Sequence, residues 1–492
     1  MRPDDLTDAV NPILLKEIRQ LFHNRGILLL LSLLLLGELA IMLIGSADYN
    51  RSIERGITSI ETGQELFYLQ CVCAGALFLF ICVLRSASLF NSERMDKDLD
   101  YSRLSVLPAA SIAFGKIASC LAMMVFILSM MMPFMMIAYY MGGISFSEIF
   151  SVIAFMVLWA LLMSQAGLLL GSFGKKNMLS LIVLLSTVLI PIPFTLFAWL
   201  LDSKHDRLPI LGLVVMCFIQ LFVQLFLWTV ASIRRGSGNV MRHPRICLFA
   251  SMVVTQAMVF AIYAFLGRGS AKDVCQFAWW MLFGEMTLLH LVLVFEEPVP
   301  GTRILQERSG SKLLRAIGIP FASGQCGAIA LSILLHVIWY LAIMALVKYS
   351  GKTGSSLMMT GGRSEGEDAL AMLTGSLYVL FYSLIAVNLQ NWFSFARRNK
   401  SLSLGLSLGV LFVLPLVIAL CVGIGDGDYE LVWMCLLTTP FCCNHSRMPY
   451  GIDSFDLLIL ASSLCLLSFL PLLPKVIRGF RDYVFRENGE VK

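Results

Sequence analysis

Apolar residues in this chain form long runs separated by short polar segments. Read with a window of about 19 residues, the sequence contains twelve apolar runs, each near the ~20 residues that cross a bilayer as a helix. The period-2 alternation of barrel strands is absent, and backbone groups in lipid need partners within their own segment. The sequence therefore predicts an all-α polytopic membrane protein with twelve transmembrane helices, at 27–45, 66–84, 118–141, 147–171, 178–201, 210–232, 246–266, 276–295, 326–348, 373–394, 401–424 and 454–474.

Composition and charge place these helices in a membrane and orient them. Of the 492 residues, 58% are hydrophobic and only 14% are charged, so polar side chains are too few to cover the apolar surface in water. The net charge is +5, but the basic residues lie in short loops between spans, which argues against a nucleic-acid partner. With a cytoplasmic N-terminus, about three quarters of the 37 Lys and Arg residues fall on the inner side, as the positive-inside rule expects. We therefore expect a multi-pass protein of the inner (plasma) membrane with both termini in the cytoplasm.

The order of the segments predicts two membrane halves. The first six spans occupy 27–232, a basic cytoplasmic linker follows at 233–245, and the other six spans occupy 246–474 before a cytoplasmic tail at 475–492. Each half has two spans, a long cytoplasmic loop (85–117 or 296–325), two spans, a short basic turn and two spans. This layout favours a parallel 6+6 duplication, although the sequences of the halves are only weakly alike.

The segment at 1–26 predicts a separate amphipathic helix before the first span. Asn11 is a favoured N-cap residue and Pro12 a favoured first helical residue, whereas Gly26 separates the segment from the span. At helical spacing one face is apolar, with Leu14, Ile18, Leu21 and Phe22. The opposite side is polar, with Lys16, Glu17, Arg19, Gln20, His23 and Asn24. A basic helix with this pattern is expected to lie in the headgroup plane of the bilayer.

The first long loop is a candidate docking surface for another protein. Its apolar residues Leu104, Val106 and Leu107 precede Pro108 and could insert into a groove, while neighbouring charges set the orientation. A solvated connector is the alternative reading of the same residues.

Several short motifs, in this order and spacing, resemble the ABC-2 type permeases, which are membrane subunits of ATP-binding cassette (ABC) transporters. They are "NPILLKEIRQ", "SER" followed by "LSVLPAASIAFGKI", the pair Gly142–Gly143, and "SQAGLLLGSFGKKN". The resemblance covers about residues 11–200, and the second half matches by layout alone. The Gly-Thr that commonly follows the family's Glu is missing here, which weakens the details of loop docking.

The resemblance implies that the first loop carries the helix that contacts the ATPase, at about Asp100–Pro108. The residues of this loop assigned to ATPase coupling are Glu93, Asp100, Leu104, Val106, Leu107, Pro108, Gly115 and Lys116. Their counterparts in the second cytoplasmic loop are Arg303, Arg315, Pro320 and Gly324.

The chain has no phosphate loop of the form G-x-x-x-x-G-K-[ST] and no other catalytic motif. We therefore expect no enzyme activity and no cofactor in this chain, with ATP and Mg bound by a separate ABC ATPase subunit. The leading expectation is a permease that exports an unidentified substrate. One chain could supply the whole pathway, and a homodimer or pairing with a second permease is the alternative.

Ionisable residues within the predicted spans are the remaining candidates, because charged groups in a bilayer are expensive. They are Glu38, Glu285 and His290, with His336 in the ninth span. Proton coupling through Glu38 or Glu285 would make the chain a secondary carrier, and hydrogen bonding between helices is the alternative role. A non-transporting membrane scaffold is also compatible with the sequence. Glu285 and His290 are five residues apart and do not share a helical face, so no metal site is predicted.

Overall fold

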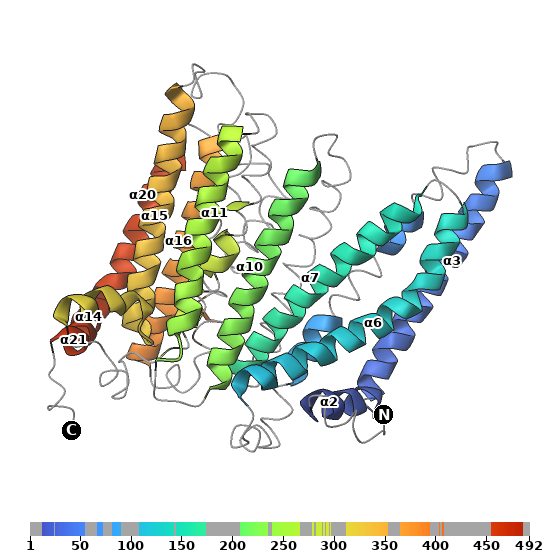
Figure 1. The fold of residues 1–492 in the computed structure, drawn as a ribbon, viewed down its shortest axis with the longest axis horizontal. Helices are drawn as coiled ribbons and strands as arrows, with labels where there is room; N and C mark the ends of the chain where they lie inside the picture. The colour runs from blue at the N-terminus through green and yellow to red at the C-terminus, as the bar shows by residue number, and fades with distance from the viewer. Residues whose placement is uncertain are drawn as a thin grey trace, which may run out of the picture. The chain divides into compact units, whose positions relative to one another are not determined.

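The structure is a computed structural model, and every regular element among the residues it describes is helical (Figure 1). It describes residues 12–23, 25–54, 66–71, 81–89, 108–141, 144–173, 207–234, 239–265, 278–279, 282–287, 289–290, 292–294, 296, 311–352, 365–393, 403, 406–407 and 454–485. Within these ranges, 6 helices are long and apolar enough to cross a membrane. The chain is therefore an all-α membrane protein, as the sequence predicts. The predicted span at 178–201 and most of the one at 401–424 lie outside the described residues.

The chain divides into two compact units. Unit 1 contains residues 1–208 and 222–235, and unit 2 contains residues 209–221 and 236–492. Helix α10 (Arg207–Ile233) contributes residues to both units.

Unit 1 is built on α2 (Pro12–His23), α3 (Arg25–Glu54), α6 (Ala109–Met141) and α7 (Phe146–Phe173). The amphipathic α2 packs against α6 and α3 and lies across their ends in Figure 1. The break between α2 and α3 falls just before Arg25, so Gly26 lies inside α3 and does not separate the two helices as predicted. Helix α7 begins with a capping box, in which the Glu148 carboxylate accepts the N–H of Ser145 at 2.8 Å.

Two glycines of α7 allow a close approach to the helical residues 81–89. A Cβ atom on Gly167 would lie 2.8 Å from the carbonyl oxygen of Val83, and one on Gly171 would lie 2.5 Å from that of Ala87. The two glycines are four residues apart on one face, which is the small-xxx-small spacing that brings membrane helices together. The stretch "GLLLG" in the sequence therefore sets how closely these helices pack.

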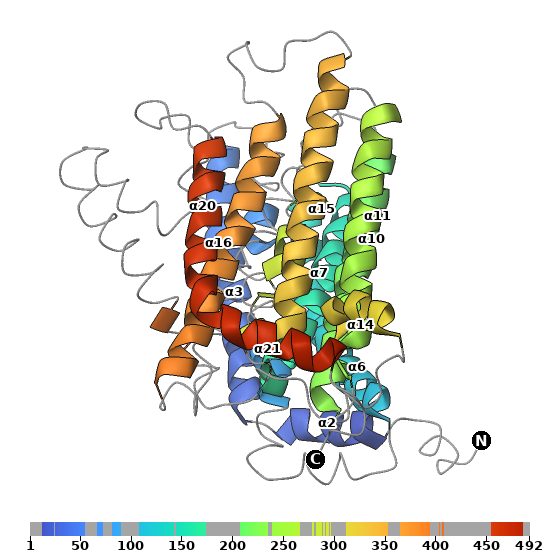
Figure 2. The same ribbon diagram turned by 90° about the vertical axis from the view of Figure 1, so that its left-hand side faces the viewer.

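Unit 2 contains four long helices that run side by side in Figures 1 and 2. They are α11 (Arg242–Phe265), α15 (Gln325–Lys352), α16 (Glu365–Trp392) and α20 (Ser454–Phe469). Each packs against its neighbour in that order. Two short elements, α14 (Lys312–Gly318) and the 3-10 turn η1 (Ile319–Phe321), lead into α15.

The end of unit 2 contains a helix that the sequence did not predict. After α20 the chain turns through η5 (Leu470–Leu472) and forms the helix α21 (Leu473–Val484). Figure 2 shows α21 leaving the axis of α20 and crossing the end of α15. It packs against α14 and α15, so most of the predicted tail up to Val484 is a docked helix.

Candidate functional site

A buried ion-pair cluster ties α2 to the first turns of α6. The Glu17 carboxylate accepts hydrogen bonds from Lys116 Nζ at 3.0 Å and from Arg85 Nη2 at 3.4 Å. Lys116 also donates to the carbonyl oxygen of Leu89 at 3.2 Å. We call Glu17, Arg85 and Lys116 the first ionic cluster.

Burial makes this cluster more than a surface contact. Glu17 is 1% exposed and the side chain of Lys116 is 0% exposed. Burial lowers the pKa of Arg85, and the neighbouring Glu17 opposes this effect. The sequence predicts Glu17 on the polar side of the amphipathic helix and Lys116 among the residues of the first cytoplasmic loop. It does not predict that these two side chains are buried against each other.

A second buried cluster lies where the chain enters α15 in unit 2. The Arg245 guanidinium, on α11, donates to the Glu296 carboxylate, to the carbonyl oxygen of Ala322 and, at 3.1 Å, to that of Gly324. The N–H of Gly324 donates to the same carboxylate at 2.7 Å. We call Arg245 and Glu296, with these backbone groups, the second ionic cluster.

Glycines shape the backbone around the second ionic cluster. Gly324 has a φ of 115°, which favours glycine because a Cβ atom would be strained there. Gly327, one turn into α15, has no Cβ atom to compete with the Arg245 guanidinium and the carbonyl oxygens of Ile319 and Ala322. The predicted candidate Gly324 therefore lies at a buried cluster, which the spacing of the loop did not indicate.

The remaining candidates of the first loop and the N-terminal segment are placed as follows. Five loop candidates and the N-cap residue lie outside the described residues: Glu93, Asp100, Leu104, Val106, Leu107 and Asn11. Pro108 is exposed directly before α6, and its carbonyl oxygen accepts the N–H groups of Ser111 and Ile112. Gly115 is buried in α6 beside Lys116. Pro12 and Phe22 belong to α2, with Ile18 half-buried and Arg19 exposed.

The candidates of the second loop lie around α14 and η1, apart from Arg303, which is outside the described residues. Arg315 donates to the carbonyl oxygen of Val484 at 3.2 Å and so joins α14 to α21. Pro320 is the central residue of η1, and its carbonyl oxygen accepts a bond from Arg245 at 3.5 Å. The loop is thus tied both to α11 and to the C-terminal helix.

The candidates within the membrane segments bond to neighbouring helices. The Ser251 hydroxyl of α11 donates to the Glu285 carboxylate, whose two oxygens lie 2.7 and 2.9 Å from the hydroxyl oxygen. His290 Nε2 lies 2.8 Å from the Ser332 hydroxyl of α15, and its ring stacks on His336 with centroids 5.3 Å apart. Glu285 and His290 therefore face different helices.

Two further ionisable residues within the membrane segments, His336 and Glu38, are also buried. His336 Nε2 bonds to the Ser376 hydroxyl of α16 at 2.8 Å, so the histidine pair links α15 to α16. Glu38 of α3 is 2% exposed, and its Oε2 has no hydrogen-bond partner among the described residues. Within the described ranges, no three His, Cys, Asp or Glu side chains gather as a metal site would require.

No family model, curated protein or solved structure matches this chain. The resemblance to ABC-2 type permeases therefore remains a prediction from the order and spacing of the motifs.

Proposed function

We propose that the chain is the permease subunit of an ABC transporter of the ABC-2 type, which exports a substrate using a separate ATPase subunit. The observation that carries the proposal is the first ionic cluster. It joins the amphipathic α2 to the helix that directly follows the predicted ATPase-coupling loop. ATP and Mg would be bound by the partner subunit.

The first ionic cluster supplies a mechanical route from this loop to the first span. The loop enters α6 after Pro108, and Lys116 lies about two turns further along that helix. A displacement of the loop would move Lys116 and, with it, Glu17 and α2, because separating a buried ion pair costs about 3–5 kcal/mol. Since α3 begins two residues after α2 ends, the displacement would also reach the first span.

Contacts within unit 2 support the proposed orientation. Segments expected in the cytoplasm bond to one another: the Ser323 N–H and hydroxyl donate to Asn239, each at 2.8 Å, and Arg245 pairs with Glu296. These contacts join the linker to the second long loop, which supports placing both segments on one side of the membrane, as the proposed twelve-span topology requires. The cytoplasmic location of both termini and insertion in the inner (plasma) membrane are proposed from the distribution of Lys and Arg.

The presence of a buried ionic cluster in each unit also supports a parallel 6+6 arrangement. In that arrangement one chain would supply both halves of the pathway, above two ATPase copies. A homodimer, or pairing with a second permease, is the other assembly compatible with the layout.

The test is copurification of an ATPase with the full-length tagged chain from native membranes, identified by mass spectrometry through its phosphate loop. Leu104→Asp and Leu107→Asp should reduce the ATPase recovered per chain at least tenfold, because a carboxylate cannot enter an apolar groove. Leu357→Asp, in the predicted outer loop, is the matched control and should leave recovery unchanged. Equal recovery with all three variants would show that this loop does not dock an ATPase.

A proton-coupled secondary carrier is the second candidate, because Glu285 is buried beside the hydroxyl of Ser251 within the membrane segments. Dye-loaded proteoliposomes that contain the purified chain alone distinguish the two. Acidification driven by a substrate gradient, lost in Glu285→Gln, would favour the carrier. Transport that requires the copurified ATPase and ATP would favour the permease.

A further inference from the structure

The C-terminal helix α21 has the two faces of a helix that lies on a membrane surface. Its residues Gly479, Tyr483 and Val484 are buried against unit 2. Next to this buried face lies an exposed apolar strip that contains Ile477 and Phe480, which are 57% and 42% exposed. The basic residues Lys475, Arg478 and Arg481 are exposed on the remaining side. Such a division places apolar residues toward acyl chains and basic residues toward headgroups.

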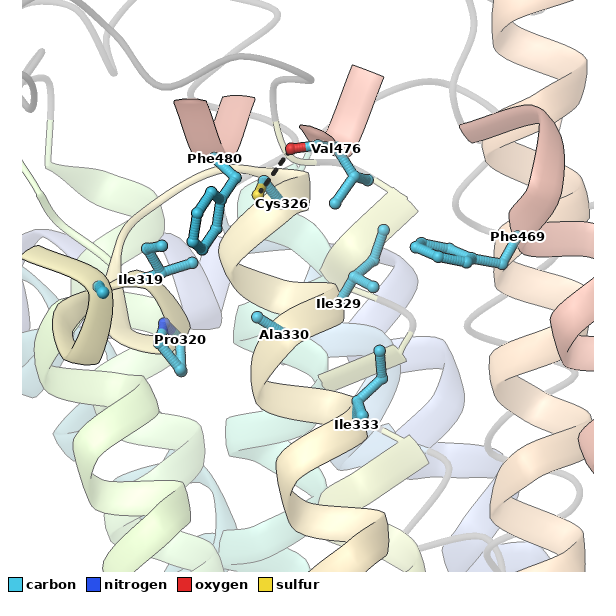
Figure 3. Close-up of a pocket in the computed structure, with 10 residues that line it drawn as sticks. Ile319, Pro320, Cys326, Ile329, Ala330, Ile333, Phe469, Val476 and Phe480 are labelled. Carbon is cyan, nitrogen blue, oxygen red and sulfur yellow. Dashed lines mark hydrogen bonds between the residues drawn. The ribbon is translucent and has the colours of Figure 1, made fainter. Parts of the chain in front are cut away.

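An apolar pocket of about 210 Å³ lies beneath this helix (Figure 3). Its walls come from α14, η1, α15, α20 and α21, and its lining includes Ile319, Cys326, Ile329, Ala330, Phe469 and Phe480. In Figure 3 the ring of Phe469 points toward Ile329, whereas the ring of Phe480 lies beside Ile319. The pocket is smaller than the roughly 300 Å³ at the lower end of the range for drug-sized ligands. Its size and lining suit a segment of a hydrocarbon chain.

The surface around the pocket is apolar on the sides that adjoin the predicted bilayer. Ile333, at the α15 end of the pocket, is 50% exposed, and Val337 one turn further along α15 is 49% exposed. On α14, Leu313 and Ile317 are 71% and 59% exposed. Because α15 is a candidate membrane span, the pocket adjoins a helix whose exposed residues would meet lipid.

The exposed basic residues around the pocket favour a lipid with an anionic headgroup. Arg478 and Arg481 are exposed and form no ion pair with any residue that the structure describes. Lys312, also exposed, lies over the ring of Phe485 at 5.9 Å, at the end of α21. Asp482 is the one acidic residue among the described residues of α21. Clusters of basic residues at a cytoplasmic membrane surface attract anionic headgroups.

We propose that this pocket binds one acyl chain of an anionic phospholipid, whose phosphate headgroup is held by Arg478 and Arg481. The lipid would fill the space between α15 and α21 and fix the C-terminal helix to the bilayer surface. This site does not depend on the proposed transport function, so loss of the ATPase interaction would leave it unchanged.

The test is native mass spectrometry of the full-length chain, released from nanodiscs that contain equal amounts of phosphatidylglycerol and phosphatidylcholine with identical acyl chains. The wild-type chain should retain one phosphatidylglycerol in preference to phosphatidylcholine. The double variant Arg478→Gln/Arg481→Gln should lose about 30-fold of this preference, because each basic residue contributes roughly a fivefold attraction. Arg234→Gln/Arg242→Gln is the control for the removal of two other basic residues.

A second arm tests the pocket itself. Ala330→Trp should fill it and abolish retention of the lipid, whereas Val337→Trp, on the exposed surface of the same helix, should not. Equal retention of both lipids by the wild-type chain would overturn the proposal, and this comparison needs no variant to fold. Unchanged retention in Ala330→Trp would also overturn it. A change from dimer to monomer with unchanged lipid would instead assign the pocket to a second copy of the chain.

Discussion

The clearest consequence of the first ionic cluster is that neutralising Glu17 should release α2 from unit 1. Glu17→Gln keeps the shape of the side chain and an oxygen that can accept a hydrogen bond, but it removes the negative charge. Lys116, with a side chain that is 0% exposed, and Arg85, at 9%, would then face each other without a counter-ion. Removing one partner of a buried ion pair destabilises the folded state by about 3–5 kcal/mol.

The lower end of that range sets the expected size of the effect. Because 1.4 kcal/mol is a factor of ten in an equilibrium constant, a loss of about 3 kcal/mol raises the open population of α2 by roughly 150-fold. Amide hydrogen exchange reports such local opening without unfolding the whole protein. The assay is hydrogen exchange of the backbone amides of residues 13–23, followed by mass spectrometry of the purified chain in nanodiscs.

Two further variants make the result interpretable. Gln20→Glu alters the charge on the exposed side of the same helix and should leave exchange within about threefold of wild type, as surface changes usually do. Adding Lys116→Met to Glu17→Gln removes one buried cation and should restore most of the protection, because apolar replacements of a buried pair are often nearly neutral. If Glu17→Gln exchanges like the wild type, the ion pair does not hold α2, and the proposed route from loop to span is wrong.

Three other predictions concern the stability of the detergent-solubilised chain, measured as its unfolding midpoint. Gly171→Ala should lower the free energy of unfolding by about 1–3 kcal/mol through overpacking, because the new Cβ atom would meet backbone atoms of Ala87. A Cβ atom on Gly37 would have no neighbour within 4 Å. Gly37→Ala should therefore raise the stability slightly, because alanine loses less conformational entropy than glycine when the helix folds. Arg245→Lys should destabilise by about 2 kcal/mol or more, since three donors in an ammonium cannot reproduce the guanidinium bonds; Arg242→Lys, which is exposed, should have no effect. Ser332→Ala should destabilise by about 1–3 kcal/mol by leaving a buried histidine nitrogen unsatisfied.

The helices were predictable where a single periodicity decides the structure. The apolar runs that became α6, α7, α11, α15 and α16 are long enough that local sequence determines both helix and membrane location. The helix at Pro12–His23 was equally predictable, because its apolar residues recur at helical spacing.

The environment of Glu17 was not predictable from this periodicity. A helical wheel records which residues share a face, but it cannot show that another helix covers the polar side. The partner that buries Glu17 is Lys116, which is 99 residues away in the sequence. Only the fold brings the two together, so a pattern within one helix could not reveal their pairing.

Helix α21 was missed for a different reason. The predicted span at 454–474 and the predicted cytoplasmic tail at 475–492 divide this helix between them, and Pro471 and Pro474 lie near the division. Proline is nevertheless compatible with the first turn of a helix, and α21 carries Pro474 in that position. The signal was present in the spacing of Leu473, Val476, Ile477 and Phe480, which is helical rather than random.

The two ionic clusters differ in which helix supplies the acid and which supplies the base, and this difference follows from the groups around them. In unit 1 the acid belongs to the helix before the first span, and one carbonyl oxygen, that of Leu89, joins the carboxylate around Lys116. In unit 2 the base belongs to α11, and it meets a carboxylate together with carbonyl oxygens of the turn into α15. A guanidinium has five donors in a fixed planar arrangement, whereas an ammonium has three. The guanidinium of Arg245 can therefore meet the Glu296 carboxylate and several carbonyl oxygens of the turn at once, in a planar arrangement that an ammonium does not reproduce. In the proposed 6+6 arrangement, the two halves would each bury an acid–base pair built from different residues, so a shared layout would not require similar sequences.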